Sequence, residues 1–150
     1  MKNLFKVSAL LVALVMLITL TACTSTDEGA VTPNETEVAS VWDEAQYTED
    51  MEMGDGATTI QVEVKAEDKS ITFTLHTDAG TLGDALLTYA LVEGDSTQYG
   101  LFIKRVNGIL ADFDVDGYYW GVYKNGEYLM SGVDTTVIAD GEHYELVRTK

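Results

Sequence analysis

Residues 59–76, TIQVEVKAEDKSITFTLH, decide the fold of this chain. On either side of a charged stretch at 66–69, apolar residues alternate with polar ones, at Ile60, Val62, Val64, Ile71, Phe73 and Leu75. Alternation with a period of two residues is typical of strands that are buried on one face. The stretch therefore predicts a β-hairpin at the start of a folded domain.

A short helix is predicted directly after this hairpin. Thr81 is expected to cap its first turn, with Asp84 three residues later as in a partial capping box. Apolar residues then recur at helical spacing, at Leu82, Ala85, Leu86, Tyr89 and Ala90. We expect Glu93-Gly94-Asp95 to end the helix.

Two Asn-Gly steps predict further hairpins after the helix. Asn107-Gly108 lies between the apolar runs 99–106 and 109–113. Asn125-Gly126 lies in the same way after residues 118–124. Asn and Gly both tolerate the positive φ angles of a two-residue hairpin turn, so each step indicates a tight connection between strands.

A last strand pair is predicted at 135–138 and 143–147, joined at Asp140-Gly141. Residues 59–150 thus predict one small α+β domain, in which a single helix packs on a mostly antiparallel sheet.

The first 23 residues have the features of a bacterial lipoprotein leader. Lys2 and Lys6 precede an apolar run at 7–20, which is shorter than a membrane span. Leu20-Thr21-Ala22-Cys23 follows and resembles the lipobox. Residues 1–22 are therefore predicted to be a signal peptide, and lipid on Cys23 is predicted to anchor the chain at the extracytoplasmic face of the cell membrane.

Residues 23–58 are predicted to be a lipid-anchored, disordered acidic linker. Residues 24–58 contain ten acidic residues and no Lys or Arg, a composition that buries little apolar surface. The alternative is an acidic docking segment around Val41-Trp42 and Tyr47, where apolar residues interrupt the acids.

Composition excludes several classes of protein. The 150 residues contain 25 Asp and Glu against 9 Lys and Arg, so the net charge is −16 and no basic footprint for nucleic acid exists. The one Cys excludes an intrachain disulfide and a multi-Cys zinc site. No nucleophile motif or phosphate-binding loop occurs, so we expect neither an enzyme nor a resident cofactor.

Four motifs in order resemble the bacterial DUF4430 domain family over roughly residues 60–148. They are GTLGDAL at 80–86, YGLFI with VNG at 99–108, the YW to NG segment at 119–126, and SGV with ADGE at 131–142.

This family is similar to the C-terminal domain of transcobalamin and intrinsic factor, the animal cobalamin carriers. The resemblance implies a β-grasp-like fold and contact with a corrinoid. In the carriers, cobalamin lies between this domain and a large α-helical barrel. The terminal aromatic segment of the family is replaced here by YELVR at 144–148.

The aromatic hairpin is the predicted ligand-binding edge, formed by Tyr118, Tyr119, Trp120, Tyr123, Asn125 and Gly126. Because side chains alternate along a strand, one set of these aromatics faces the core and the other can face a ligand. Exposed Tyr and Trp stack on planar ligands or sugars and anchor protein partners. The alternative is that Trp120 is a core residue under the helix.

Asp112, Asp114 and Asp116 before Gly117 match half of an EF-hand calcium loop. The twelfth position, which should be a bidentate Glu, is Tyr123. Weak calcium binding and a solvated acidic turn both remain open.

Two functions follow. The first is a cell-surface lipoprotein with a small-ligand-binding module that captures a corrinoid such as cobalamin, or another small molecule, and passes it to a transporter. The second is an interaction module, displayed on the cell envelope, that binds a second envelope protein or a glycan.

Overall fold

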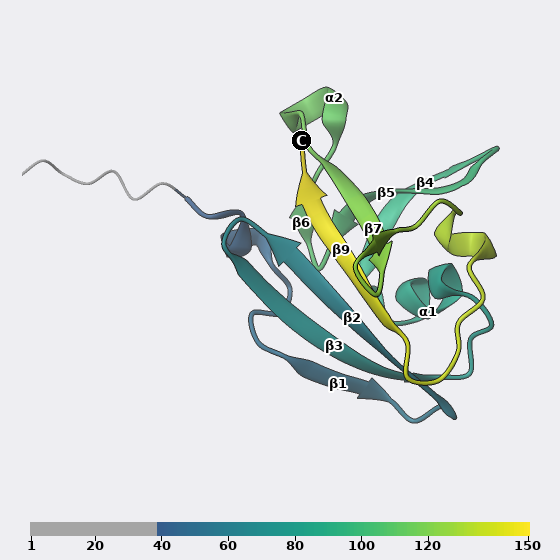
Figure 1. Ribbon diagram of the computed structural model, residues 1–150. Coiled ribbons are helices and arrows are strands. Elements are labelled where there is room, and N and C mark those ends of the chain that lie inside the picture. The colour runs from purple at the N-terminus through teal and green to yellow at the C-terminus, as the bar shows by residue number, and fades with distance from the viewer. Residues whose placement is uncertain (1–38) are drawn as a thin grey trace, which may run out of the picture. The chain divides into compact units, whose positions relative to one another are not determined.

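The computed structural model describes residues 39–150, and the fold is that of these residues. The predicted signal peptide, Cys23 and the predicted linker up to residue 38 lie outside them. Strands and short helices alternate along the described chain (Figure 1): η1 Val41–Glu44, β1 Met51–Gly54, β2 Thr58–Ala66, β3 Lys69–Thr77, α1 Leu82–Thr88, β4 Val92–Thr97, β5 Gly100–Val106, β6 Ile109–Leu110, α2 Phe113–Asp116, β7 Tyr119–Lys124, β8 Glu127–Tyr128, η2 Val133–Thr135 and β9 His143–Thr149. The predicted α+β class is confirmed.

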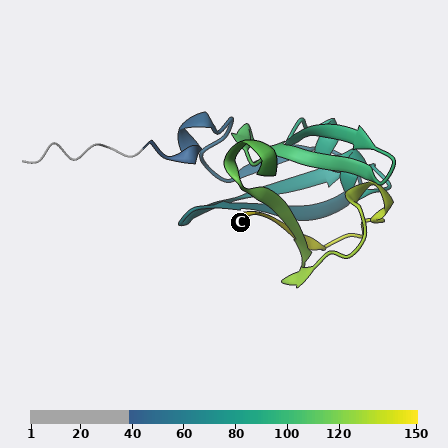
Figure 2. The same cartoon turned by 90° about the horizontal axis from the view of Figure 1, so that it is seen from above.

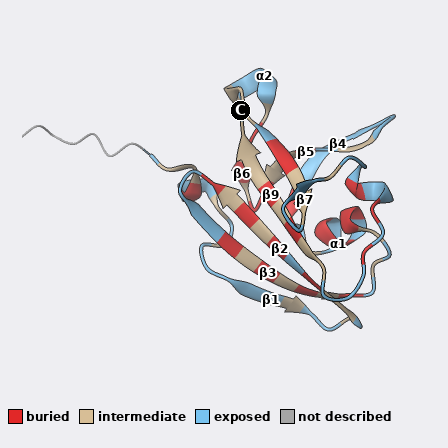
Figure 3. Cartoon of the chain, viewed as in Figure 1, coloured by how far each residue is buried: buried red, intermediate tan, exposed pale blue. Residues whose placement is uncertain are grey.

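The predicted hairpin forms the centre of the main sheet. Strands β2 and β3 pair antiparallel, with Val62 opposite Phe73. Both side chains are fully buried, as the two-residue alternation predicts. Figure 3 shows buried residues recurring along both strands. The turn between the strands contains Glu67 at a φ of 54°.

The main sheet has six strands in the order β1-β3-β2-β9-β7-β8. Strand β9 lies parallel to β2 and antiparallel to β7. A hairpin, a helix and a later strand parallel to the first strand of that hairpin make the arrangement β-grasp-like. Edge strand β1 also pairs parallel, with β3, whereas β2 with β3, β7 with β8 and β7 with β9 pair antiparallel.

A second sheet of three strands, in the order β4-β5-β6, packs with α1 on the inner face of the main sheet (Figure 2). Strand β4 contains Glu93-Gly94-Asp95, which the sequence analysis expected to end the helix. That expectation is wrong because all residues of β4 after Val92 are exposed, so the strand carries no apolar alternation. It is a strand only because its backbone pairs with that of β5.

Helix α1 begins as predicted but is shorter. The Thr81 hydroxyl accepts a hydrogen bond from the Asp84 N–H at 3.2 Å, which caps the first turn. The helix ends at Thr88, and Ala90 adopts a φ of 51°. The predicted strand at 135–138 is also absent from the described chain: η2 begins this region, and Val137 makes a single bridge to Thr81.

Residues 40–54, here called the N-terminal strap, correct the predicted linker of 23–58. The strap contains η1 and β1 and is part of the domain, which therefore does not start at residue 59. Trp42 is buried, and its Nε1–H donates to the Ala66 carbonyl at 2.8 Å. The ring of Tyr47 packs edge-on against that of Phe73, with 5.7 Å between the ring centroids. A few apolar residues anchor the strap while its acidic residues remain exposed. The amino-acid composition of the strap is therefore like that of a disordered linker, although the strap is folded.

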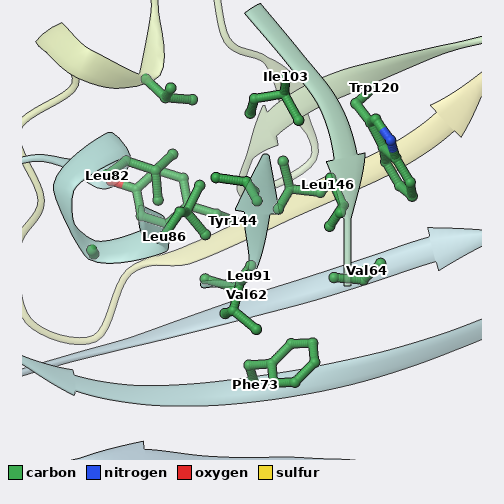
Figure 4. Close-up of a cluster of buried hydrophobic side chains, with 14 of the residues drawn as sticks. Val62, Val64, Phe73, Leu82, Leu86, Leu91, Ile103, Trp120, Tyr144 and Leu146 are labelled. Carbon is green, nitrogen blue, oxygen red and sulfur yellow. The ribbon is translucent and has the colours of Figure 1, made fainter. Parts of the chain in front are cut away.

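The core lies between the main sheet, α1 and β5 (Figure 4). Leu82 and Leu86 extend from α1 toward Val62 and Leu146 of the main sheet, and Ile103 of β5 closes the other side. Buried Tyr144 donates its hydroxyl proton to Glu142. Burial, together with this hydrogen bond, raises the pKa of Tyr144 well above its usual range.

Candidate functional site

The predicted aromatic hairpin is present. Strands β7 and β8 flank Asn125 and Gly126, whose φ angles of 51° and 82° form the expected two-residue turn. Both turn residues are exposed at the tip of the hairpin. The hairpin is short, since β8 pairs with β7 through only two residues, Glu127 and Tyr128.

The six residues predicted as one ligand-binding edge lie in different surroundings. Trp120 is a buried core residue, as the alternative in the sequence analysis held. Its indole Nε1–H has no hydrogen-bond partner among residues 39–150. Tyr118 lies under the Arg148 guanidinium, whose carbon is 3.7 Å from the ring centroid. Tyr123 packs edge-on against Tyr128, with 5.4 Å between the ring centroids. Tyr118 and Tyr123 are half-buried, so only Tyr119 and the two turn residues of the set are exposed.

A small apolar groove lies between β5 and β7, and we call it the β5–β7 groove. Its volume is about 220 Å³, and β5, β7 and the chain from β8 to η2 line it, with Leu101, Phe102, Ile103, Tyr119, Trp120, Val122, Tyr128, Leu129, Ser131, Gly132 and Val133. Three aromatic side chains on its rim are partly exposed, at 49% for Phe102, 37% for Tyr119 and 53% for Tyr128. The groove therefore offers aromatic surface to a ligand.

Sequence reasoning found one rim residue, Tyr119, and missed Phe102 and Tyr128. Phe102 lies in the predicted strand 99–106, but nothing in the amino-acid sequence of this strand indicates that it lies beside β7. The two strands belong to different sheets, and their approach arises from tertiary packing.

Strand pairing directs the backbone of Trp120 toward the groove. In an antiparallel sheet, the N–H and C=O of successive residues point alternately to one neighbouring strand and to the other. The Asn125 N–H donates to the His143 carbonyl of β9, whereas the Val122 carbonyl accepts from the Leu129 N–H on the opposite side. Trp120 lies two residues before Val122, so its N–H and C=O point away from β9, to the side on which Leu129 lines the groove.

Asp134 of η2 positions the β5 side of the groove. Its Oδ2 accepts a hydrogen bond from the Leu101 N–H at 2.5 Å. A Cβ atom at Gly83 of α1 would lie 2.6 Å from this carboxylate, and one at Gly100 would lie 2.7 Å from it. Glycine at these two positions therefore lets one carboxylate join α1, β5 and η2.

A larger and more polar hollow, of about 680 Å³, lies beside α1. Its lining includes Asp55, Asp78, Asp84 and His76, and only Leu87 and Tyr89 contribute large apolar side chains. No three His, Cys, Asp or Glu side chains within residues 39–150 are placed to hold one metal ion. The β5–β7 groove is smaller but has the aromatic surface, so we take it as the candidate site.

The three aspartates that match half of a calcium loop form the short helix α2 instead. Asp112 caps this helix through the Asp114 N–H and pairs with Lys104 at 2.9 Å. The Lys104 ammonium lowers the pKa of the Asp112 carboxyl. Asp116 accepts from two backbone N–H groups and pairs with Arg148 at 2.7 Å. Intramolecular donors thus hold two of the three carboxylates.

The two histidines lie on the outer face of the main sheet, each beside a carboxylate. His76 Nε2 is 2.6 Å from Glu52, and its Nδ1 is 3.0 Å from the Thr59 hydroxyl. His143 is 3.5 Å from Glu63. None of these residues belongs to the groove.

Membrane attachment lies outside what the described residues address. Within residues 39–150, no helix has the length and apolar character needed to cross a bilayer. Cys23 is not among these residues, so its lipidation stays a prediction.

Comparison with known proteins identifies relatives of the chain. Residues 80–144 match the model of a family described as a domain of unknown function, DUF4430. A crystal structure of a protein from Ruminococcus gnavus, provisionally described as metal binding, is similar at 35% identity and a TM-score of 0.59, over 62% of this chain and 97% of that chain. Haptocorrin in complex with Cbi is similar at 18% identity and a TM-score of 0.48, over 65% of this chain and 26% of that chain. No curated protein matches the chain.

Proposed function

The chain belongs to the DUF4430 family of domains of unknown function, and on that premise we propose that it is a ligand-binding module whose binding surface is the β5–β7 groove. The observation that carries the proposal is the apolar groove with three partly exposed aromatic rings on its rim. Concave apolar sites with a few polar groups are the usual form of a small-ligand site.

The backbone of Trp120 supplies the polar groups. Its N–H and C=O both point toward the groove, so one amide of a ligand can donate to the carbonyl and accept from the N–H. The aromatic rim would contact apolar parts of the same ligand. These features favour a ligand that combines apolar surface with amide groups.

The ligand that we propose is a corrinoid of the cobalamin type, whose macrocycle has apolar faces and peripheral amides. A groove of about 220 Å³ is smaller than the roughly 300–1,000 Å³ of sites that enclose drug-sized ligands. It would therefore hold one edge of a corrinoid and leave the rest for a second surface. A transporter that receives the ligand would supply that surface.

Anchoring at the cell membrane completes the proposal. Lipid on Cys23 would hold the domain at the extracytoplasmic face, with the preceding signal peptide removed. Growth with radioactive palmitate tests this step, with label expected in the native chain and absent from Cys23→Ala. Equal incorporation in both would overturn it.

The proposal includes neither a metal site nor a catalytic role. The metal binding provisionally assigned to the Ruminococcus gnavus protein needs several ligands around one ion, and residues 39–150 bring no three suitable side chains together.

Titration of the purified chain with cobalamin and with cobinamide tests the ligand. In a Trp42→Phe background Trp120, which lines the groove, is the remaining tryptophan, so its fluorescence reports binding there. Tyr128→Ala should weaken binding, whereas Tyr99→Ala, which removes a side chain that is 87% exposed and outside the groove lining, should not. Absence of binding up to millimolar ligand would exclude the corrinoid.

The alternative is an interaction module for an envelope protein or a glycan. It is favoured by large apolar side chains exposed in segments next to the groove lining, with Tyr99 at 87% and Met130 at 91%. Exposed apolar surface of this kind marks protein contacts. If Tyr99→Ser with Met130→Ser abolishes capture of a purified transporter while corrinoid never binds, this second function replaces the first.

A further inference from the structure

The two Asn-Gly turns of the domain share one backbone conformation and differ in their surroundings. Asn107 and Asn125 have φ angles of 52° and 51°, and both following glycines have a φ of 82°. Any chemical difference between the two steps must therefore come from packing and hydrogen bonding.

Asn107 is locked in the interior. Its residue is fully buried, its Oδ1 accepts from the Tyr47 N–H at 2.9 Å, and its Nδ2 donates to the Tyr47 carbonyl at 2.8 Å. Gly108 is also covered, because a Cβ atom there would lie 2.6 Å from the Glu44 carbonyl oxygen. The N-terminal strap thus closes over this turn and holds both ends of the carboxamide.

Asn125 is open to water. Both Asn125 and Gly126 are exposed, and no atom lies within 4 Å of the position that a Cβ at Gly126 would take. Among the described residues, no group hydrogen-bonds to the side-chain carboxamide of Asn125. The backbone N–H of Asn125 donates to the His143 carbonyl. Its side chain is therefore free to rotate toward the next backbone nitrogen.

We propose that Asn125 is a site of spontaneous deamidation, that Asn107 is protected from it, and that the change loosens the rim of the β5–β7 groove. The Gly126 N–H faces the Glu145 carboxylate, and it must turn from this acceptor before its nitrogen gives its proton to hydroxide and attacks Asn125 Cγ. Glycine has no side chain to obstruct this attack. A C–N bond forms and closes a succinimide ring, while the Cγ–Nδ2 bond breaks. The amide nitrogen takes a proton from water and leaves as ammonia. A second water then opens either ring C–N bond and yields aspartate or isoaspartate.

For the same attack to occur at Asn107, its side-chain carboxamide must first separate from the backbone of Tyr47. That movement breaks two buried hydrogen bonds and leaves two backbone groups of the strap without partners. Folding therefore protects one Asn-Gly step and leaves the other reactive.

Isoaspartate at position 125 would alter the hairpin. It adds a methylene to the backbone of a two-residue turn whose length sets the register of the strands that it joins. Strand β8 is held by only two residue pairs, so Tyr128 and Leu129 would shift at the groove. This last step rests on the proposed function of the groove, whereas the deamidation does not.

Tryptic peptide masses test the reaction on the full chain. Cleavage at the basic residues separates Asn107, in peptide 106–124, from Asn125, in peptide 125–148. The chain is incubated in mildly alkaline buffer, once folded and once in urea. In the folded chain, only peptide 125–148 should gain the mass of amide-to-acid conversion, and in urea both peptides should gain it. This readout involves no ligand, so it is independent of whether the groove binds one.

Three results would overturn the proposal. The first is equal conversion of both peptides in the folded chain. The second is no conversion of folded Asn125 while the urea sample converts. The third is conversion of peptide 125–148 in Asn125→Gln, whose longer side chain does not close the five-membered ring. The Leu129 N–H, which donates to the Val122 carbonyl at 2.8 Å, should exchange its hydrogen faster in the isoaspartate form than in fresh protein. Unchanged exchange would refute the effect on the groove.

Discussion

Replacing Asn107 by Gly is expected to destabilise the domain far more than the same change at Asn125. Both positions have a φ near 50° in an Asn-Gly turn, and Gly-Gly also suits this turn. At Asn107 the change removes two buried hydrogen bonds to the Tyr47 backbone. Each contributes about 0.5–1.5 kcal/mol, so the loss is about 1–3 kcal/mol. The upper half of this range applies because the N–H and C=O of Tyr47 lose their partners while partly buried.

At Asn125 no side-chain hydrogen bond is lost among the described residues, and we expect a change within about 0.5 kcal/mol, as for most exposed positions. Any cost of added chain freedom from glycine occurs in both variants and cancels in the comparison. A difference of about 2 kcal/mol would separate the two melting temperatures by roughly 10 °C in a domain of this size.

Urea unfolding of the full chain, followed by tryptophan fluorescence, measures both variants. Trp42 lies in the N-terminal strap, so its signal also reports release of that segment. Equal destabilisation at the two positions, or a loss at Asn107 below about 0.5 kcal/mol, would refute the reasoning that the strap is an integral part of the domain.

Gly83→Ala should lower the unfolding free energy by about 1–3 kcal/mol, since its methyl group would lie 2.6 Å from the carboxylate of η2, whereas a Cβ at Gly80 meets no atom within 4 Å. Thermal melts compare Gly83→Ala with Gly80→Ala, and equal melting temperatures would contradict the steric argument. Burial alone would raise the pKa of Asp116, but hydrogen bonds from the Tyr118 N–H and the Arg148 guanidinium lower it below the ordinary 3.8. The contribution of Asp116 to stability is therefore complete above about pH 4 and is lost as the pH falls through its folded-state pKa. Asp116→Asn should flatten this part of the stability curve in urea unfolding at stepwise lower pH, and an unchanged slope would count against the pair. Tyr119→Ala should weaken corrinoid binding without changing the melting temperature, whereas Trp120→Ala should cost roughly 3–5 kcal/mol of stability. Calorimetric titration and melts separate these effects, and a collapsed fold in Tyr119→Ala would make that residue structural.

Sequence reasoning succeeded where a signal lies within a few consecutive residues. Alternation predicted β2 and β3, a hydroxyl and a carboxylate three residues apart predicted the start of α1, and Asn-Gly predicted two turns. It failed at β4, whose residues beyond Val92 are exposed and polar, because only pairing with β5 makes it a strand. It also failed at the strap, where a few buried side chains among many acids determine the structure.

The candidate site was predicted in part for the same reason. The aromatic run at 118–123 was found from composition, and alternation predicted that one set of its side chains faces the core. Which set does so depends on where the rest of the chain packs. The burial of Trp120 and the position of Phe102 beside β7 are decided by the approach of the second sheet.

The sequence by itself determined the class of the fold, the hairpins and their turns, because these depend on backbone preferences and periodicity that act between near neighbours. It also determined that two Asn-Gly steps carry the same intrinsic tendency to deamidate. The tertiary structure alone decided where the domain begins, which aromatics reach the surface and which of the two steps is protected. Each of these depends on contacts between residues far apart in the chain, such as Tyr47 with Asn107, and no local pattern encodes such contacts.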